Sequence, residues 1–188
     1  SRIRTDYAWF EEHIGPTINA EVVVQFPPDS MPDPIDRFRL VRDVDDHLRS
    51  TDLVGGVFSA RSFLPSPPSK KSRSIRSTVL EANIRKQLED PDSPLQDAGY
   101  IAKDKKGNQL WRISFRFPFD EAIDYRTEFQ RVQAEVIPIL EEAGQGISPQ
   151  FTGGVPMTTE SQDVLLQDLF RSFLAAFGIV AIIMMLLL

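Results

Sequence analysis

The sequence contains no cysteine and only two histidines, His13 and His47. Without cysteine the chain forms no disulfides and no thiolate metal sites, and the compartment stays open because a cysteine-free domain suits both cytosol and periplasm. The two histidines lie far apart in the sequence without a partner at ligand spacing, so we expect them on helix or protein surfaces rather than on a metal. An excess of basic residues is also lacking. The net charge of -6, from 27 acidic and 21 basic residues, argues against nucleic-acid binding.

Motifs of catalysis are lacking as well. The sequence has no GxSxG, no phosphate-binding glycine loop and no evident set of serine, histidine and acid. Asp43, Asp45 and Asp46 lie close together, but the turn glycine of a calcium loop is missing around them, which favours a solvated helix face. We therefore expect a chain that is not an enzyme and that uses no cofactor and no metal.

Charged residues are lacking after Arg171. The run from 173 to 188 is apolar apart from Gly178, and as a helix it would be about 24 Å long, just short of the roughly 30 Å hydrocarbon core of a bilayer. Because the chain starts on serine and ends inside this run, we expect a fragment whose last segment is a truncated transmembrane helix. Five residues mark the length of that helix: Phe173, Ala176, Ile179, Ile182 and Leu186.

The rest of the sequence predicts strands and amphipathic helices. Alternating apolar residues predict strands at 20–28 and 109–117; in the second, Trp111 and its alternate neighbours face a core. Two further strands are expected at 53–65 and 148–156, and 99–102 forms a hairpin with 109–117. Helical spacing predicts helices that begin after Asp33, at Ser74, after Asp120 and at Thr158 or Thr159. The third should end at Gly144 and kink at Pro138.

These elements predict an α+β fold of the ferredoxin-like split βαβ type, with an inserted linker and a hairpin. We divide the chain into an amphipathic lead-in (1–20), a first βαβ unit (21–64), a connector with a modest helix (65–98), the hairpin with the second βαβ unit (99–157), a juxtamembrane helix (158–172) and the truncated transmembrane helix (173–188). Glycine pairs at 55–56 and 153–154 add slight support for a duplicated architecture.

Two basic regions invite a functional interpretation. The stretch 61–86, within and around the Pro/Ser/Lys-rich connector, carries seven basic residues and one acid, and could bind anionic headgroups, although a solvated linker is favoured. Arg112 and Arg116 share the polar side of the 109–117 strand. They could line a substrate path, whereas the favoured interpretation is that they keep one sheet face wet.

Three segments resemble a known family. They are "WFEEHIGPTINAEVVVQF", "GVFSARSFLP" and above all "FTGGVPMTTESQDVLLQDLFRSFLAAFGIVAIIMMLLL". They look like the resistance-nodulation-division (RND) superfamily of exporters, in particular its smaller MMPL-type branch. The resemblance covers most of the chain from Trp9 onward and is most specific from Phe151 to Leu188.

The resemblance implies the first porter domain of a proton-driven exporter of hydrophobic or amphipathic compounds, such as lipids or drugs. It implies a multi-pass protein of the cytoplasmic membrane, with residues before about 172 on the extracytoplasmic, periplasmic side. The implied partners are the lipid bilayer, the substrate, a second porter domain of the same chain, and a further copy or an accessory protein. The proton-relay carboxylates of the family lie in later helices, so no residue here is assigned that role.

Other classes of protein remain open. A tail-anchored binding module, or an accessory subunit for secretion or lipid transfer, would use the same apolar helix as a plain anchor. A soluble enzyme with an apolar core helix ranks third, because a uniformly apolar helix of this length is rare in soluble proteins.

Overall fold

Two nine-residue strands form the centre of the protein, β1 (Ile18–Phe26) and β4 (Gln109–Phe117). They pair antiparallel, with Val22 opposite Ile113, and each alternates between buried and more exposed residues. Their buried side chains on one face of the sheet are Ala20, Val22, Val24, Phe26, Trp111, Ile113, Phe115 and Phe117. The predicted division of β4 into a core face and a polar face is confirmed.

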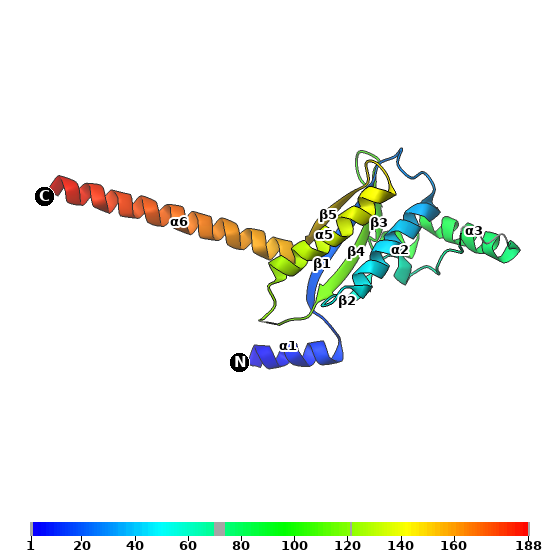
Figure 1. The fold of residues 1–188 in the computed structure, drawn as a ribbon, viewed down its shortest axis with the longest axis horizontal. Coiled ribbons are helices and arrows are strands. Elements are labelled where there is room, and N and C mark those ends of the chain that lie inside the picture. Colours follow the sequence, from blue (N-terminus) through cyan, green and yellow to red (C-terminus); the bar gives the residue numbers. More distant parts are fainter. Residues whose placement is uncertain (1, 70–73, 121, 188) are drawn as a thin grey trace.

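The computed structural model describes residues 2–69, 74–120 and 122–187. The fold is α+β with one antiparallel sheet (Figure 1). Its main strands run in the order β2-β4-β1-β5, and β3 pairs with β4 beside this path. The remaining elements are α1 (Arg2–His13), α2 (Pro34–Ser50), β2 (Gly55–Phe58), the 3-10 turn η1 (Ala60–Ser62), α3 (Ile75–Glu89), α4 (Pro94–Asp97), β3 (Ile101–Lys103), α5 (Tyr125–Ala143), β5 (Ser148–Gly153) and α6 (Gly154–Leu187).

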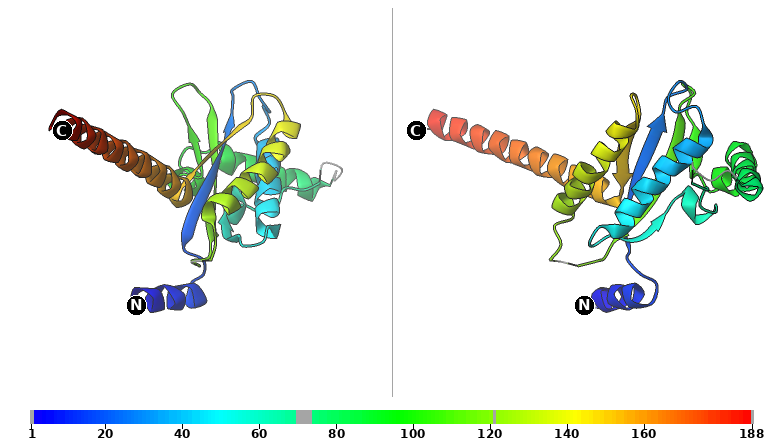
Figure 2. Two further views of the ribbon diagram at one scale, coloured as in Figure 1. Left: turned by 60° about the vertical axis from the view of Figure 1, so that its left-hand side comes forward. Right: turned by 45° about the vertical axis from the view of Figure 1, so that its right-hand side comes forward.

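Helices α2 and α5 cover one face of the sheet (Figure 2). Asp33 caps α2 by accepting a hydrogen bond from the backbone N–H of Ile35, and Pro34 occupies the first helical position, as the sequence predicts. The apolar faces of both helices pack on the sheet through Ile35, Phe38, Val41, Val44, Leu48, Phe129, Val132, Val136 and Leu140. The core therefore lies between these two helices and the strands, and the opposite sheet face carries polar side chains.

The second predicted strand is shorter than the sequence indicates. Only Gly55–Phe58 pairs with β4, and the register shifts between those two residues. The chain then turns into η1, because the Ser59 hydroxyl accepts a hydrogen bond from the backbone N–H of Arg61 and so caps the turn. Residues 60–65, predicted as strand, are therefore turn and coil.

The prediction that Asp120 caps α5 is wrong. Asp124 is the cap, accepting hydrogen bonds from the backbone N–H groups of Arg126 and Thr127 at 3.1 and 3.4 Å. Asp120 instead accepts from the backbone N–H of Ala122 in the preceding loop. The end of α5 at Gly144 is confirmed.

The last helix also starts earlier than predicted. It begins at Gly154, directly after β5, and not at Thr158 or Thr159. Pro156 is compatible with this start, because backbone N–H groups in the first turn of a helix have no partner within the helix. At the other end of the chain, β1 begins at Ile18, inside the predicted lead-in, and α1 occupies most of the rest of that segment.

Candidate functional site

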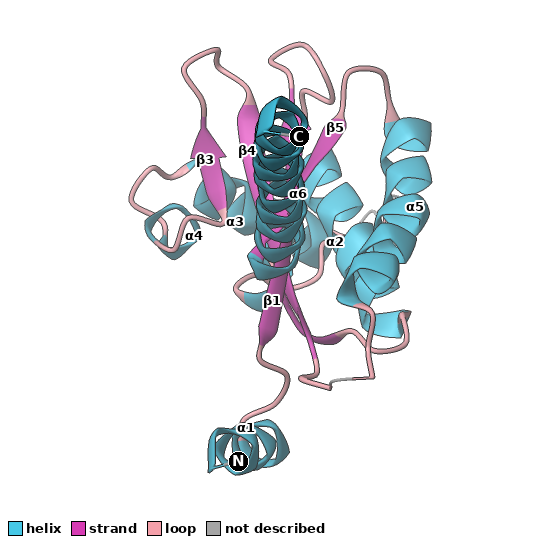
Figure 3. Cartoon of the chain, turned by 90° about the vertical axis from the view of Figure 1, so that its left-hand side faces the viewer, coloured by secondary structure: helices cyan, strands magenta, loops and turns pink. Residues whose placement is uncertain are grey.

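Helix α6 projects from the domain for most of its length (Figure 1), and Figure 3 shows it nearly end-on in front of the sheet. Residues Val164–Leu186 form a stretch of 23 residues that is long and apolar enough to span a membrane, and none of the stretch is buried in the structure. At 1.5 Å per residue it is about 34 Å long, which matches the roughly 30 Å hydrocarbon core. A core helix of a soluble protein would be covered by its neighbours, and this helix is not.

The five residues predicted to mark the transmembrane helix all lie on α6 and are exposed: Phe173, Ala176, Ile179, Ile182 and Leu186. The apolar stretch begins nine residues before Phe173, so it includes Asp168 and Arg171 near one end. The boundary predicted at residue 173 lies inside this stretch and stays a prediction. Charged residues within a turn or two of a span end can reach the membrane interface, so they are compatible with a span.

The joint between the sheet and α6 is tightly packed. Gly153 has a φ of +109°, and a Cβ placed on it would lie 2.8 Å from Cα of Ala20 in the neighbouring strand. A Cβ on Gly154 would lie 2.8 Å from Oδ1 of Asn19. Gly153 therefore requires glycine, because its φ is positive and the atoms around it are backbone, whereas a side chain at Gly154 would require Asn19 to move. Helix α6 starts against β1 without a linker.

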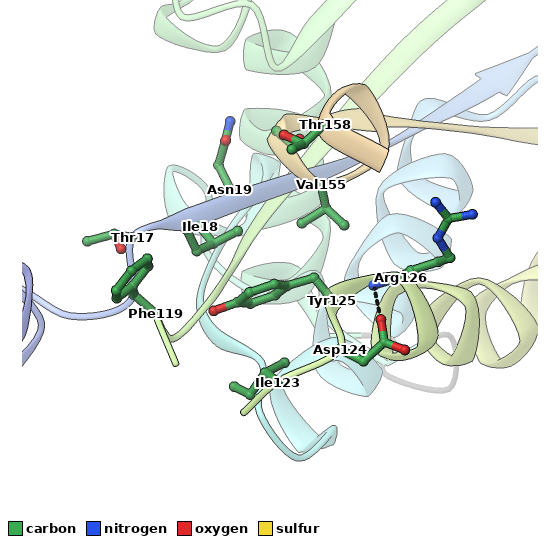
Figure 4. Close-up of a pocket in the computed structure, with 11 residues that line it drawn as sticks. Thr17, Ile18, Asn19, Phe119, Ile123, Asp124, Tyr125, Arg126, Val155 and Thr158 are labelled. Carbon is green, nitrogen blue, oxygen red and sulfur yellow. Dashed lines mark hydrogen bonds between the residues drawn. The ribbon is translucent and has the colours of Figure 1, made fainter. Parts of the chain in front are cut away.

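A cleft of about 450 Å³ lies where α6 leaves the domain (Figure 4). Its walls come from the start of β1, the loop before α5, the first turn of α5 and the first turn of α6. Ile18, Val155 and the Tyr125 ring face a common space, and Ile123 lies next to it, whereas Arg126 points away. The cleft is within the range of about 300–1,000 Å³ that is typical of small-molecule sites.

Hydrogen bonds hold the loop that forms one wall of this cleft. The Tyr125 hydroxyl donates to the carbonyl of Pro118 at 2.8 Å and accepts from the backbone N–H of Asp120 at 2.8 Å. The hydroxyl of Thr127 donates to the Asp124 carboxylate at 2.7 Å, and this bond, with those from the backbone, lowers the pKa of Asp124 below its ordinary value of 3.8. The carboxylate at the rim of the cleft is thus ionised at neutral pH.

A second hollow of about 430 Å³ adjoins the first and shares Thr17 and Ile18 with it. Phe10 and Asp6 of α1 form its other wall. Glu11 ties α1 to the domain, because its carboxylate accepts hydrogen bonds from the backbone N–H of Phe119 and from the Thr17 hydroxyl. Together the two hollows make up the depression beside the start of β1.

The sequence analysis missed this depression. Its wall residues come from segments more than 100 positions apart, so no local pattern brings them together. One local signal was present: Phe119 and Ile123 are large apolar residues in a loop that is otherwise polar, and Phe119 is 37% exposed in the structure. Such residues in a loop often contact a ligand or another surface.

Arg112 and Arg116 lie elsewhere, on the sheet face that α2 and α5 leave free. Arg112 donates to the carbonyl of Ala98 at 2.7 Å and stacks on the Tyr100 ring with its guanidinium 4.7 Å from the ring centroid. Arg116 lies 5.8 Å from the ring centroid of Phe58. The structure thus gives both arginines packing roles on the open face and does not bring them to the cleft.

The interpretation of Asp43, Asp45 and Asp46 as a solvated helix face is wrong for Asp45, which lies buried under η1. Asp45 is fully buried and accepts hydrogen bonds from the hydroxyl of Ser59 at 2.7 Å, from Nε of Arg49 at 2.6 Å and from Nη1 of Arg61 at 3.2 Å. Asp46 also contacts Arg61. These bonds fix η1 and the end of β2 on α2.

Neither histidine sits in a metal-like cluster. His13 stacks on Trp9 at a centroid distance of 4.5 Å, and Nε2 of His47 lies 3.1 Å from Oε2 of Glu135. In the part of the chain that the structure describes, no group of three or more metal-ligating side chains occurs.

The described part of the basic connector pairs with α2 and its cap. Arg39 pairs with Glu81 at 2.9 Å, and Arg85 pairs with Asp33 at 3.0 Å. Helix α3 extends from the domain on the side opposite to α6 (Figure 1). A membrane that receives α6 would therefore lie far from α3, which disfavours headgroup binding by this region; residues 70–73 lie outside the described residues.

No protein-family model and no curated protein matches this chain. The function proposed below therefore depends on the sequence and on the geometry of α6 and the sheet.

Proposed function

We propose that this chain is the first extracytoplasmic porter domain of a proton-driven exporter of the RND superfamily, of the MMPL-type branch, with α6 as its second transmembrane helix. The observation that carries the proposal is the unbroken course of α6, from the last strand of the sheet into an unburied stretch of 23 residues that is long and apolar enough to span a membrane. The domain would guide a hydrophobic or amphipathic compound from the membrane, and proton flow through other parts of the protein would drive export.

The sheet supports the same proposal. Helix α2 connects β1 to β2, which lie on either side of β4, and α5 connects β4 to β5, which lie on either side of β1. This connectivity supports the ferredoxin-like split βαβ arrangement that we propose for the domain. A rigid sheet joined directly to a membrane helix suits a domain that moves with its transmembrane part and presses against a second porter domain.

A cysteine-accessibility experiment tests the predicted location. Because the chain has no cysteine, Ile75→Cys creates a single thiol in it, at a position 86% exposed on the side opposite to α6. The full-length gene product, with any cysteines outside this segment replaced, is treated in intact cells with a membrane-impermeant maleimide. In a Gram-negative host the outer membrane is first permeabilised. We expect labelling without disruption of the cytoplasmic membrane.

Labelling only after that membrane is opened would place the domain in the cytoplasm. The chain would then be a tail-anchored binding module, an alternative favoured by the observation that α6 is the single membrane-length apolar helix among the described residues. Transport itself is tested in energised everted vesicles of the full-length protein with a fluorescent amphiphile. Transport that persists when the proton gradient is collapsed would contradict the proposal.

A further inference from the structure

Helix α1 stands apart from the sheet and from the helices that cover it (Figure 1). None of its described side chains is buried, and Trp9 and Phe10 are exposed. The second hollow lies between α1 and the start of β1, so this side of α1 is not closely packed. The position of α1 therefore depends strongly on specific polar contacts.

Glu11 makes the polar contacts that connect α1 to the domain. Its carboxylate accepts hydrogen bonds from the backbone N–H of Phe119 and from the hydroxyl of Thr17. Among the described side chains of α1, Glu11 alone hydrogen-bonds outside the helix. Hydrogen bonds to a carboxylate are about twice as strong as those between neutral groups.

The segment that Glu11 binds is held from its other side by α5. The hydroxyl of Tyr125, in the first turn of α5, donates to the carbonyl of Pro118 and accepts from the backbone N–H of Asp120, both at 2.8 Å. Segment 118–120 is thus bonded to α5 through its two ends and to α1 through Phe119 in its middle. A shift of α1 that keeps the Glu11 bond therefore pulls on the segment that positions Tyr125.

The connection between α1 and β1 allows such a shift. Gly15 lies just after α1 with a φ of +111°, and a Cβ placed on it would meet nothing within 4 Å. A glycine in open space changes its backbone angles at little steric cost, as hinge positions do. The N-terminus of α1 and the far end of α6 lie on the same side of the domain (Figure 3), but α6 joins the sheet without a linker. Of these two helices, α1 has the movable attachment.

We infer that Glu11 is a positioning residue that latches α1 to segment 118–120, and that α1 turns about Gly15 when this latch opens. Because Tyr125 holds the same segment, the latch couples α1 to the first turn of α5. Phe119 and Tyr125 both line the larger cleft, so the position of α1 also sets the position of this cleft wall. The latch consists of contacts within the domain and does not depend on the proposed function.

Distance measurements between two spin labels test the latch. Because the chain has no cysteine, Thr5→Cys on α1 and Ala134→Cys on α5 introduce the only two thiols, both at exposed positions. The whole chain is purified in detergent, and pulsed electron paramagnetic resonance gives the distribution of distances between the labels. We expect one dominant distance when Glu11 is present.

Glu11→Ala and Glu12→Ala are matched variants, since they remove the same side chain from neighbouring positions of α1. Glu11→Ala should lower the ratio of the dominant distance to all others about tenfold or more, because two hydrogen bonds to a carboxylate are lost. Glu12 is exposed, so Glu12→Ala should leave the ratio unchanged. Glu11→Gln should restore most of the ratio, because its amide oxygen still accepts from Phe119. Alanine is a stronger helix former than glutamate, so a loss of α1 itself would not explain these results.

Tyr125→Phe tests the coupling to α5. The substitution removes only the hydroxyl, whose hydrogen bonds go to Pro118 and Asp120, yet it should lower the same α1 distance ratio about threefold or more. Added to Glu11→Ala it should have little further effect, because both substitutions act through segment 118–120.

Every result supports or overturns the latch. A wild type without a dominant distance, an unchanged distribution in Glu11→Ala, or an equal change in Glu12→Ala would overturn it. An ineffective Tyr125→Phe, or effects of the two substitutions that multiply independently, would overturn the coupling. If Glu11→Ala loses the wild-type circular dichroism spectrum, Thr17→Val takes its place, since it removes one of the two bonds to Glu11, and an unchanged ratio there would also overturn the latch. None of these results affects the labelling and transport experiments that test the proposed function.

Discussion

The sharpest prediction concerns Ile179, four residues past the centre of the apolar stretch Val164–Leu186. Its side chain is 59% exposed, so in water Ile179→Arg would relieve an exposed apolar residue and would not disturb any packing. In a bilayer the same arginine costs roughly 2.5–3.5 kcal/mol on insertion scales, because its charge must leave water. Ile179→Arg should therefore improve solubility if α6 lies in water and lower membrane insertion if α6 lies in a bilayer.

The magnitude is large relative to the driving force. The thirteen Leu, Ile, Val and Phe residues from 164 to 186 contribute at most about -4 to -8 kcal/mol on the same scale, and Asp168 and Arg171 oppose insertion. One arginine near the middle removes a third or more of this gain. A cost of about 2.5–3.5 kcal/mol lowers the insertion equilibrium roughly 60- to 300-fold.

The assay is translation in the presence of microsomes, with glycosylation sites on either side of α6 reporting the inserted fraction. We expect a clear loss of insertion for Ile179→Arg and none for Ile75→Arg, the matched change at the exposed tip of α3. Equal insertion of wild type and Ile179→Arg would refute the interpretation of α6 as a span. An Ile179→Arg variant that is more soluble than wild type, with an unchanged membrane-bound fraction, would also refute the interpretation of α6 as a span.

Three further predictions follow from the domain. Asp45→Ala should lower the free energy of unfolding by about 2–3 kcal/mol in urea titrations, because Ser59 and two arginines lose a fully buried acceptor. Asp45→Asn should lower the free energy of unfolding less than Asp45→Ala does. Equal losses for the two variants would contradict the role of the Asp45 charge. The lowered pKa of Asp124 means that its carboxylate stabilises the fold above pH 3.8 and that this stabilisation is lost as the pH falls through the folded-state pKa. The melting temperature of Asp124→Asn should therefore fall less on acidification than that of the wild type. Parallel curves of melting temperature against pH would contradict this. A chain that ends at Gln162 should stay soluble with a mixed helix and strand spectrum, because the buried hydrophobic core ends at Val155, and aggregation would show that the domain needs α6.

Local sequence pattern was sufficient for the elements that depend on a single stretch of chain. The alternation around Trp111 predicts β4 and its core face, and Asp33 followed by Pro34 predicts the start of α2. In both cases the physical cause, a period of two or a cap, lies within a few residues of the feature it determines.

Prediction failed where two local solutions compete. Asp120 and Asp124 both precede the apolar periodicity of α5, and both are good caps. Asp124 is the cap in the structure because Thr127 donates a second bond to its carboxylate and Glu128 follows in the first turn. The spacing of Thr127 and Glu128 after Asp124 was a usable signal.

The cleft could not be predicted, because it depends on how distant segments pack. Ile18, Ile123 and Val155 meet only once β1, the loop before α5 and the start of α6 are assembled. The apolar stretch, in contrast, was evident from composition alone, and the stretch in the structure extends nine residues before the predicted boundary at 173, across Asp168 and Arg171.

The joint at Gly153 and Gly154 has a mechanical consequence. Because α6 is one helix of 34 residues, about 51 Å long, and starts against Ala20 without a linker, its axis and the sheet turn together as one lever. A change of about 10° in helix tilt, small against the roughly 0–40° range of membrane helices, displaces the far end by about 9 Å. If α6 instead pivots within the bilayer, the same tilt carries the extramembrane domain sideways, and the cleft at the base of α6 moves with it.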